Sequence, residues 1–550
     1  MNIFFNLSLI FVQQFWAFLY PLKPQNVVYH SPLNIPLVLA ANFGELRNNH
    51  YHTGLDFKTN HNIGYNLYSI DEGYIARVNV SPYGYGKAVY INHPGGLTSV
   101  YAHCSEFKGV LAEKIKNIQL ESKNSEVEIY FQPNEIKVQK GDVFALSGNT
   151  GGSTAPHLHF EIRDTYTEEA LNPLNFGFDI QDHKSPILRR LKIYALDKHG
   201  FLVPGKEKEY NLSKSDLDFN LPANFCPSDG KIGVAIDGSD YFDAANNSCG
   251  LYRIELISKK DTLYKQQIDR IGFDVSRYIN IQTDYLAFKQ GRKYYKCFFN
   301  SLNPLKIFDE SKNGQIVPKK GLKQNFTLKV SDVQNNSTSI RFSLTLDGLN
   351  SEYSFLESGF LNPNEPQQFK SDNGVVIDFP AMCTYEPYMP TVKYNYPSTR
   401  ILSSQIPVQN ALLITIPPLT GVDVKKQYIT VDQNRRSRPL ITTIKKGNLV
   451  AESKFFGEFN IGIDTTAPSI SYFSNRSNSN ITYCTWNLNE NESGLASYRA
   501  FINEKWQILD YDYKTNRVTL STNEKFKSGS IIRIEAEDNC GNVQTKTYNL

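Results

Sequence analysis

Three short segments in the first third of the chain carry histidine and aspartate at spacings that suit metal-dependent chemistry. In one of them, His157 and His159 are separated by a single residue, and Leu158 and Phe160 alternate with them. Residues two apart in a β-strand project from the same face, so both imidazoles would lie on one side and the apolar residues on the other. Taken alone, such a pair is more often two surface histidines than a binding site.

The second segment places a histidine four residues before a carboxylate, at His52 and Asp56. A helix would bring the two side chains together, but Gly54 and the flanking Tyr51 and Phe57 favour an extended run. Even spacing in an extended run again places both side chains on one face. Neutral imidazole and carboxylate are ordinary ligands of zinc, although a turn with a surface hydrogen-bond pair explains the segment equally well.

The third segment is the end of a predicted β-hairpin. Residues 87–93 and 97–103 have the strand pattern, and a Pro-Gly-Gly turn joins them. Strand alternation places His103 on the same face as Ser99 and Tyr101. A single histidine at a strand end is usually structural, so its meaning depends on the other two segments.

The elements that must hold these side chains are predicted to be short strands between about residues 26 and 180. Segments 128–131 and 143–146 continue the β pattern, and only 110–120 has a helical pattern. Aromatic residues make up 13% of the chain, which favours strands, and 34 Gly with 26 Pro supply turns. The expected fold class is therefore all-β.

Taken together, in this order and within one small β domain, the three segments indicate a particular protein family. Residues 42–172, about a quarter of the chain, resemble the lysostaphin-type zinc metallopeptidases, also called LytM-like peptidoglycan endopeptidases. The motifs that carry the resemblance are Asn-Phe-Gly-Glu-Leu-Arg at 42–47, His-x-x-x-Asp at 52–56, Gly-x-x-Thr-x-x-Tyr-x-His at 95–103, Val-Gln-Lys-Gly-Asp at 138–142, Ser-Gly-Asn-Thr-Gly at 147–151 and His-x-His-Phe-Glu at 157–161. The resemblance implies a small β-sheet metallopeptidase domain at the N-terminus, and the strand pattern of the rest of the chain predicts β-sandwich domains after it.

The resemblance also implies roles for five side chains. The His and Asp of the first motif and the second His of His-x-His correspond to His52, Asp56 and His159, which would bind one zinc ion per chain. The first His of His-x-His and the His after Tyr-x correspond to His157 and His103, the implied catalytic pair. Three protein ligands leave a fourth tetrahedral position open, as catalytic zinc sites do. Either imidazole of the pair suits the role of general base.

Two residues near these motifs have open interpretations. Arg47 would bind a substrate carboxylate or pair with a neighbouring acid, and His50 is expected to line the cleft rather than to bind metal.

Seven cysteines are scattered without a Cys-x-x-Cys pair, which excludes a cysteine zinc site. The pairs Cys226–Cys249 and Cys484–Cys540 are candidate disulfides, and buried unpaired thiols explain them equally well. Cys104 is expected to pack inward as a small hydrophobe.

The N-terminus and the charge balance indicate where the protein acts. Residues 1–22 are predicted to be a secretory signal peptide, because residues 1–20 are apolar and uncharged and, with Gln13 and Gln14 among them, fit such a signal better than a spanning helix. No later stretch has the length and apolar character of a membrane span, so the mature chain is expected to have none. The 58 Lys and Arg nearly balance 55 Asp and Glu, which excludes a typical nucleic-acid binder. The expected location is the periplasm or cell envelope of a bacterium.

The remainder of the chain is predicted to form three further β domains after a metallopeptidase domain at 26–184. They occupy 185–350, 351–464 and 465–550. The first and last of these share a Pro near the start, a Gly-Leu pair after a polar turn and a polar turn after a late strand. This pattern predicts immunoglobulin-like β-sandwiches on either side of a third β unit. These rear modules are the candidate contacts for an envelope protein partner.

The function implied by the resemblance is zinc-dependent hydrolysis of peptide bonds in peptidoglycan stem peptides or cross-bridges, as part of cell-wall remodelling. One alternative is a non-catalytic protein that binds the envelope or activates another hydrolase. A second alternative is an adhesion or scaffold protein whose function lies in the rear modules. Degenerate relatives lose metal ligands, whereas all five side chains are present here. Metal content separates these classes, because about one zinc per purified chain supports the enzyme.

Overall fold

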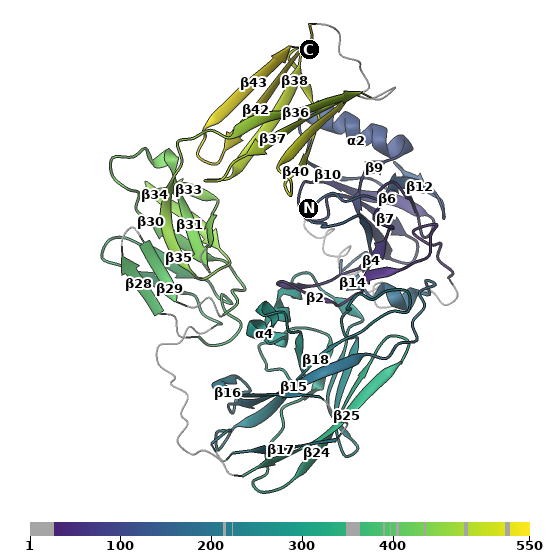
Figure 1. The fold of residues 1–550 in the computed structure, drawn as a ribbon, viewed down its shortest axis with the longest axis vertical. Coiled ribbons are helices and arrows are strands. Elements are labelled where there is room, and N and C mark those ends of the chain that lie inside the picture. Colours follow the sequence, from purple (N-terminus) through teal and green to yellow (C-terminus); the bar gives the residue numbers. More distant parts are fainter. Residues whose placement is uncertain are drawn as a thin grey trace, which may run out of the picture.

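The structure is a computed structural model that describes residues 27–212, 216–222, 224–347, 363–388, 391–395, 398–402, 406–433, 436–477, 482–522 and 529–549. The predicted signal peptide at 1–22 lies outside these residues. Strands dominate the described part of the chain (Figure 1), which confirms the predicted all-β class. Among the described residues the α-helices are α2 (Gly109–Ser122), α3 (Ile279–Gln282) and α4 (Tyr285–Lys289). No helix of the described part is long and apolar enough to cross a bilayer.

The N-terminal unit is built on one large antiparallel sheet. In sheet order, its main strands are β1 (Leu39–Ala41), β4 (Leu55–Lys58), β13 (His157–Asp164), β8 (Leu97–Cys104), β7 (Lys87–His93), β6 (Gly73–Val80) and β10 (Val127–Tyr130). The strand β11 (Lys137–Val138) pairs with β6, and β14 (Ala170–Leu171) pairs with β13. The remaining strands of the unit form two small sheets, β5 (Asn66–Tyr68) with β12 (Val143–Leu146) and β9 (Glu106–Phe107), and β2 (Leu46–Arg47) with β3 (His50–Tyr51). A short 3₁₀ helix, η1 (Pro173–Phe176), follows β14.

Several local predictions for this unit are confirmed. The predicted hairpin is β7 paired with β8, and the helical pattern at 110–120 lies within α2. On β13 the apolar face is directed to the core, where the ring of Phe160 packs against Phe57 and Tyr101. Leu158 and Phe160 are fully buried. This packing of alternate residues fixes the register of β13, because a shift by one residue would turn its histidines inward.

The second unit contains two sheets and a short helical segment. The first sheet contains β16 (Leu202–Asn211), β15 (Ile187–Leu196), β18 (Lys231–Ser239) and β22 (Tyr294–Lys296), in that order. The second contains β17 (Asp216–Leu221), β25 (Ser337–Leu346), β24 (Gln324–Ser331), β19 (Arg253–Ser258), β20 (Asp261–Gln267) and β23 (Phe308–Asn313). The 3₁₀ helix η2 (Ser276–Tyr278) runs directly into α3, and α4 follows.

One hydrophobic core joins the first two units across the predicted boundary at 184/185. It includes residues from Leu33 to Leu346, and β14 pairs with β21 (Arg270–Ile271) of the second unit. The side chain of Asn42 also exchanges two hydrogen bonds with the backbone of Gly250. A Cβ at Gly250 would lie 2.7 Å from the Cα of Glu45, so only glycine permits this close approach. The two units are therefore packed as one body.

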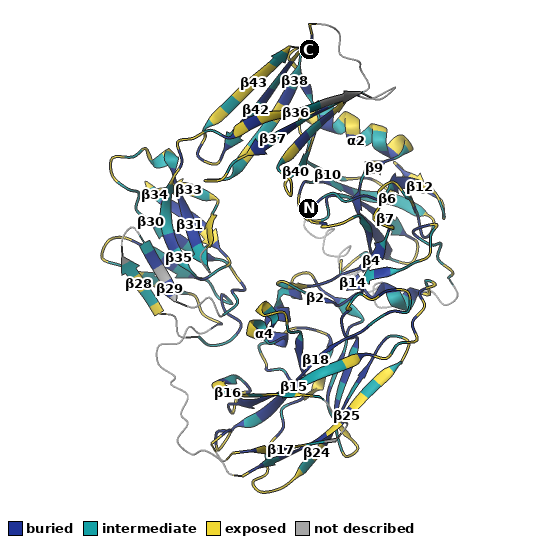
Figure 2. Cartoon of the chain, in the orientation of Figure 1, coloured by how far each residue is buried: buried dark blue, intermediate teal, exposed yellow. Residues whose placement is uncertain are grey.

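The third and fourth units are two-sheet sandwiches with their own cores, whose inward residues are dark blue in Figure 2. The sheets of the third unit are β26 (Gln367–Lys370), β27 (Val376–Phe379), β30 (Leu412–Ile416), β34 (Asn448–Ser453) and β33 (Thr442–Lys445), and β28 (Thr391–Asn395), β29 (Ser398–Leu402), β35 (Glu458–Ile463), β31 (Gln427–Gln433) and β32 (Arg436–Pro439), with η3 (Val424–Lys426) before β31. Those of the fourth are β36 (Ser469–Ser477), β37 (Thr482–Asn489), β41 (Arg517–Thr522) and β40 (Leu509–Asp512), and β39 (Lys505–Gln507), β38 (Leu495–Ile502), β42 (Ile531–Asp538) and β43 (Val543–Asn549).

The four units follow one another around a ring that closes on itself (Figure 1). Beyond the joint core of the first two, the successive contacts include Arg277 Nη2 to the Val408 carbonyl at 2.7 Å, Lys426 Nζ to the Cys540 carbonyl at 3.1 Å and Lys87 Nζ to Asp510 at 2.9 Å. The last of these joins the fourth unit to the N-terminal one. The chain thus brings its C-terminal sandwich back to the unit that carries the histidines.

The seven thiols are all free and buried in this structure. The candidate disulfides Cys226–Cys249 and Cys484–Cys540 are not formed, so the alternative of buried unpaired thiols describes them. Cys104 is fully buried in the core of the N-terminal unit, as predicted for a small hydrophobe.

Candidate active site

Strand register brings the predicted site residues together on one face of the large sheet. Asp56 on β4 lies directly opposite His159 on β13, and His159 lies opposite Ala102 on β8. Residues opposite one another in antiparallel strands share a face of the sheet. His52 comes from the turn between β3 and β4, where its backbone N–H donates to the Glu45 carbonyl at 2.9 Å. Side chains up to 107 residues apart in the sequence thereby meet.

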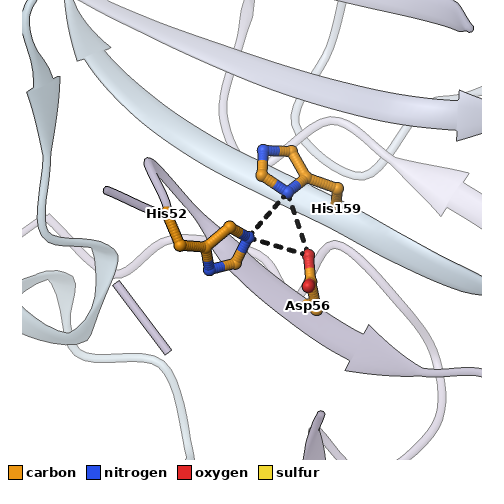
Figure 3. A group of neighbouring side chains, drawn as sticks. All are labelled: His52, Asp56 and His159. Carbon is orange, nitrogen blue, oxygen red and sulfur yellow. Dashed lines mark hydrogen bonds and ion pairs between the residues drawn. The ribbon is translucent and has the colours of Figure 1, made fainter. Parts of the chain in front are cut away.

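His52, Asp56 and His159 point toward one another and form a compact group (Figure 3). Nε2 of His52 lies 3.0 Å from Oδ1 of Asp56 and 3.0 Å from Nδ1 of His159, and this Nδ1 lies 2.9 Å from the same Oδ1. Ligands about 2.0–2.1 Å from a tetrahedral zinc ion lie roughly 3.3 Å apart. The three atoms therefore have nearly the mutual separation of a zinc ligand set.

The outer nitrogen of each imidazole is held by a hydrogen-bond acceptor. Nδ1 of His52 donates to the Asn42 carbonyl at 2.7 Å, and Nε2 of His159 donates to Oε1 of Glu161 at 2.8 Å. Because a carbonyl and a carboxylate only accept, the protons are on the outer nitrogens and the inner nitrogens have lone pairs. Two lone pairs and a carboxylate oxygen then face one another, which requires a cation between them.

The electrostatics of this group agree with that requirement. Burial alone would raise the pKa of Asp56, but its interactions with the neighbouring imidazoles, that of His52 above all, hold it well below its usual range. Burial would lower the pKa of His159, but hydrogen bonds to Asp56 and Glu161 outweigh it and raise the pKa to about 9. Without a metal ion a proton supplies the cation, and a metal ion can replace it.

Glu161 is the centre of a buried network behind His159. It accepts hydrogen bonds from the hydroxyls of Thr53 and Tyr85, both at 2.6 Å, and pairs with Arg163 at 2.6 Å. Burial would raise the pKa of Glu161, but the charge of Arg163 and these hydrogen bonds keep it well below its usual range. A charged, fully bonded Glu161 fixes the orientation of the His159 ring.

His103 reaches the site through a break in strand alternation, which corrects the predicted face. Lys87 pairs with Cys104 but Val89 pairs with Tyr101, so β8 contains one extra residue, a β-bulge. His103 has φ of 61°, a left-handed conformation that is rare for a residue other than glycine. Tyr101 consequently packs in the core, whereas the His103 ring lies 4.8 Å from the His157 ring.

His103 and His157 form a second pair of imidazoles beside the first group. Nδ1 of His103 donates to the Thr150 carbonyl at 2.9 Å, and Nδ1 of His157 donates to the Ala155 carbonyl at 2.8 Å. Each Nε2 is therefore the acceptor, and that of His157 lies 3.4 Å from Oδ1 of Asp56. Burial and the two neighbouring imidazoles lower the pKa of His103 to about 3, so its ring is neutral at physiological pH.

The structure resolves the open interpretations of two nearby residues. Nη2 of Arg47 lies 3.3 Å from Asp56 and 3.6 Å from Glu45, so Arg47 pairs with neighbouring acids. His50 is exposed, and its Nδ1 bonds to the Asn48 carbonyl outside the metal-binding group. The sequence motifs did not indicate the contribution of Tyr85, whose hydroxyl bonds Glu161 and whose ring lies 5.3 Å from that of His159. A lone tyrosine in a turn carries no spacing signal.

Part of this site lies in a segment that matches a known protein family. The sequence profile of Peptidase family M23 matches residues 50–121, which include His52, Asp56 and His103. This chain carries a peptidase family M23 domain. The resemblance to lysostaphin-type, LytM-like peptidases is thereby confirmed for the N-terminal unit, hereafter the M23 domain.

Individual proteins are similar to this chain over limited lengths. The protein "DD-carboxypeptidase/endopeptidase Mpg" of Neisseria meningitidis is 33% identical over 92 residues, which cover 17% of this chain and 15% of that protein. An "Uncharacterized metalloprotease" of Haemophilus influenzae is 30% identical over 155 residues, 28% of this chain and 26% of that protein. The solved catalytic domain of lysostaphin from Staphylococcus simulans shares 26% identity, with 24% of this chain and 87% of that domain covered and a TM-score of 0.18. The chain thus spans about a seventh to a quarter of the length of these curated relatives.

The fourth unit docks against the loop that orients the second histidine pair of the M23 domain. Nζ of Lys514 donates to the carbonyls of Asn149 at 2.7 Å and Ser153 at 3.0 Å. Thr150, the acceptor for His103, lies between these two residues and also lines a cavity of about 380 Å³ between the two units. The C-terminal sandwich therefore braces the loop that holds the hydrogen-bond acceptor of His103.

Proposed function

We propose that this protein is a zinc-dependent endopeptidase that hydrolyses peptide bonds in peptidoglycan stem peptides or cross-bridges. His52, Asp56 and His159 would bind one zinc ion per chain. The observation that carries the proposal is the convergence of three lone-pair donors within 3.0 Å of one another, with the outer nitrogen of each imidazole held by an acceptor. Only a bound cation satisfies such an arrangement. A zinc ion held by these residues would supply Lewis acidity to a water molecule and to the scissile carbonyl.

His103 and His157 would supply the proton transfers. Both rings are held through Nδ1 by backbone carbonyls, so Nε2 of each is ready to accept a proton. One ring would take a proton from the attacking water, and that proton would later pass to the leaving amine. The other, once protonated or bonded through its Nε2, would stabilise the developing oxyanion.

The substrate class and location are supported by the relatives and by the N-terminal sequence. The Neisseria meningitidis relative is named as a DD-carboxypeptidase and endopeptidase, and it is 33% identical to this chain over 92 residues. The apolar residues 1–22 have the composition of a secretory signal peptide. We therefore place the activity in the periplasm or cell envelope, with the rear sandwiches available to an envelope partner.

Digestion of purified sacculi tests this function. The protein loaded with zinc is expected to release muropeptides with new amino and carboxyl termini, identified by mass spectrometry, while the chelator-treated protein releases none. Glycan fragments with intact peptides, or no release above the chelated control, would contradict the proposal. A protein that binds sacculi without cleaving them would instead fit the non-catalytic alternative.

Removal of the Lys514 ammonium group is expected to slow hydrolysis without affecting metal content. The Lys514→Ala variant loses two hydrogen bonds that hold the loop with Thr150, each worth about 1 kcal/mol. We expect initial rates on sacculi to fall by roughly fivefold to tenfold. Lys505→Ala, on the same sandwich but outside this contact, is the matched control and should retain the parent rate. Equal rates for Lys514→Ala and the parent would show that docking does not brace the loop.

A further inference from the structure

A second group of metal-binding side chains lies in the second unit, outside the M23 site. Asp182, Asp240 and Asp332 each present an oxygen, and these oxygens all lie within 4.8 Å of one another. Asp182 precedes β15, Asp240 follows β18, and Asp332 follows β24, so three separate segments converge. The residues are 7%, 2% and 1% exposed, respectively. We call these three residues the acidic trio.

The negative charge of the acidic trio has no basic counterpart. Among the residues that the structure describes, no Lys, Arg or His forms an ion pair with any of the three carboxylates. The adjacent His183 pairs with Asp243, and Lys184 Nζ donates to the carbonyls of Phe242 and Asp243. Burial and mutual repulsion raise the pKa of Asp182 to about 7 and that of Asp240 to about 8. Buried carboxylates are normally paired or bound to a metal ion.

One oxygen of the trio also lacks a hydrogen-bond donor. Oδ1 of Asp240 is buried and has no hydrogen-bond partner among the residues that the structure describes, and the residue is only 2% exposed. Buried polar atoms are nearly always satisfied, so an orphan beside two further carboxylates indicates an absent ligand. Together, the uncompensated charge and the orphan oxygen point to a cation among these three side chains.

The fourth unit contains a similar group of three acidic residues, and one of its carboxylates has hydrogen-bond donors that the acidic trio lacks. Asp464, Glu490 and Asp538 also present oxygens within 4.8 Å of one another. Asp464 and Asp182 each precede a proline by four residues. In this unit, however, Ser493 donates through both its N–H and its hydroxyl to Oδ2 of Asp464.

The two groups share a second turn with the same hydrogen bonds. Asn336 and Asn542 follow Asp332 and Asp538 by four residues, and each donates its N–H to Oδ1 at 2.9 Å and its Nδ2 to Oδ2 at 2.8 Å. The residue before the Gly-Leu pair is Ser493 in the fourth unit and Cys249 in the second. A thiol is a weak hydrogen-bond donor, so Cys249 cannot stabilise a carboxylate of the acidic trio as the Ser493 hydroxyl stabilises Asp464.

We propose that the acidic trio is a calcium site. Three carboxylates offer only oxygen ligands, which suit a hard divalent cation rather than zinc. Calcium tolerates several carboxylates and completes its shell with water and carbonyl oxygens, whereas Mg²⁺ retains most of its own water. A calcium ion here would tie the segment that leaves the M23 domain, through Asp182, to the ends of β18 and β24. It would thereby fix the junction between the first two units.

Calcium binding to the full chain tests the proposal at pH 7.5, with zinc present throughout. In equilibrium dialysis against CaCl₂, the parent is expected to bind one ion with an affinity that Asp240→Asn lowers at least tenfold. Calcium at a hundred times its dissociation constant should raise the Tm of the parent by about 5 °C and leave that of Asp240→Asn unchanged. In chelator, Asp240→Asn should be at least as stable as the parent, because one repulsive charge has gone.

Two further variants keep the test decisive. Glu490→Gln, in the matching group of the fourth unit, should retain the parent calcium affinity. If Asp240→Asn does not fold by circular dichroism, Asp182→Asn replaces it with the same expected loss. The proposal is overturned if the parent binds no calcium saturably below 5 mM, if these Asp variants bind as the parent does, or if Asp240→Asn is destabilised equally with and without calcium.

Discussion

The His159→Ala protein is expected to lose metal and hydrolysis together. Nδ1 of His159 is one of the three converging atoms, and the remaining two ligands cannot hold zinc in a tetrahedral catalytic site. Zinc per chain, measured by inductively coupled plasma mass spectrometry after dialysis, should fall from about one to near zero. Muropeptide release should fall by more than a hundredfold, since even changes to the partners of ligands cost about 10-fold to 100-fold in affinity or activity.

His50→Ala is the matched control for this experiment. His50 is an exposed histidine two residues before His52, and its Nδ1 bonds to the Asn48 carbonyl rather than to the metal-binding group. That variant should retain metal and activity, and circular dichroism should show that both variants fold. A His159→Ala protein that holds zinc as the parent does would remove His159 from the ligand set.

The second large effect is expected at His103, where catalysis should be lost and metal retained. The ring lies beside His157 but is not one of the three converging ligands, and its Nδ1 is held by the Thr150 carbonyl. Loss of a positioned acid–base group costs about 10²–10⁴ in rate. Both His103→Ala and His103→Asn should therefore show this loss on sacculi, with about one zinc per chain still bound.

The two substitutions separate chemistry from backbone strain. His103 has φ of 61°, a conformation that asparagine adopts more readily than alanine. The Ala variant should therefore unfold at a lower temperature than the Asn variant, while the two lose the same activity. If either variant digests sacculi at the parent rate, His103 has no catalytic role.

Short-range spacing predicted the parts of the site that lie on regular strands. The alternation of residues 157–163 is sufficient to place His157 and His159 on one face, because the period of a strand is two and Leu158 and Phe160 must be buried. The hairpin of β7 and β8 and the helix α2 follow from equally local signals. Residue types at these positions suited a metal site, whereas metal-dependent hydrolysis was implied by the resemblance of the combined motifs to lysostaphin-type peptidases.

Alternation failed at His103, where the fold departs from a regular strand. The extra residue in β8 inverts the side of the sheet that His103 faces, and a bulge of one residue leaves no periodic trace in the sequence. The roles of Tyr85 and Thr150 were equally inaccessible, because each depends on a contact between loops rather than on a repeated spacing. Such contacts are set by the packing of segments that are distant in the chain.

By itself, the sequence determined which residues can do chemistry, the all-β character of the chain and the strands that carry His157 and His159. Tertiary structure decided which atoms face the metal-binding centre, since the tautomers of His52 and His159 depend on Asn42 and Glu161. It also decided that one core joins the first two units and that the fourth returns to the M23 domain. The physical reason is that periodicity records only local burial, whereas these contacts depend on how distant surfaces pack and pair their polar groups.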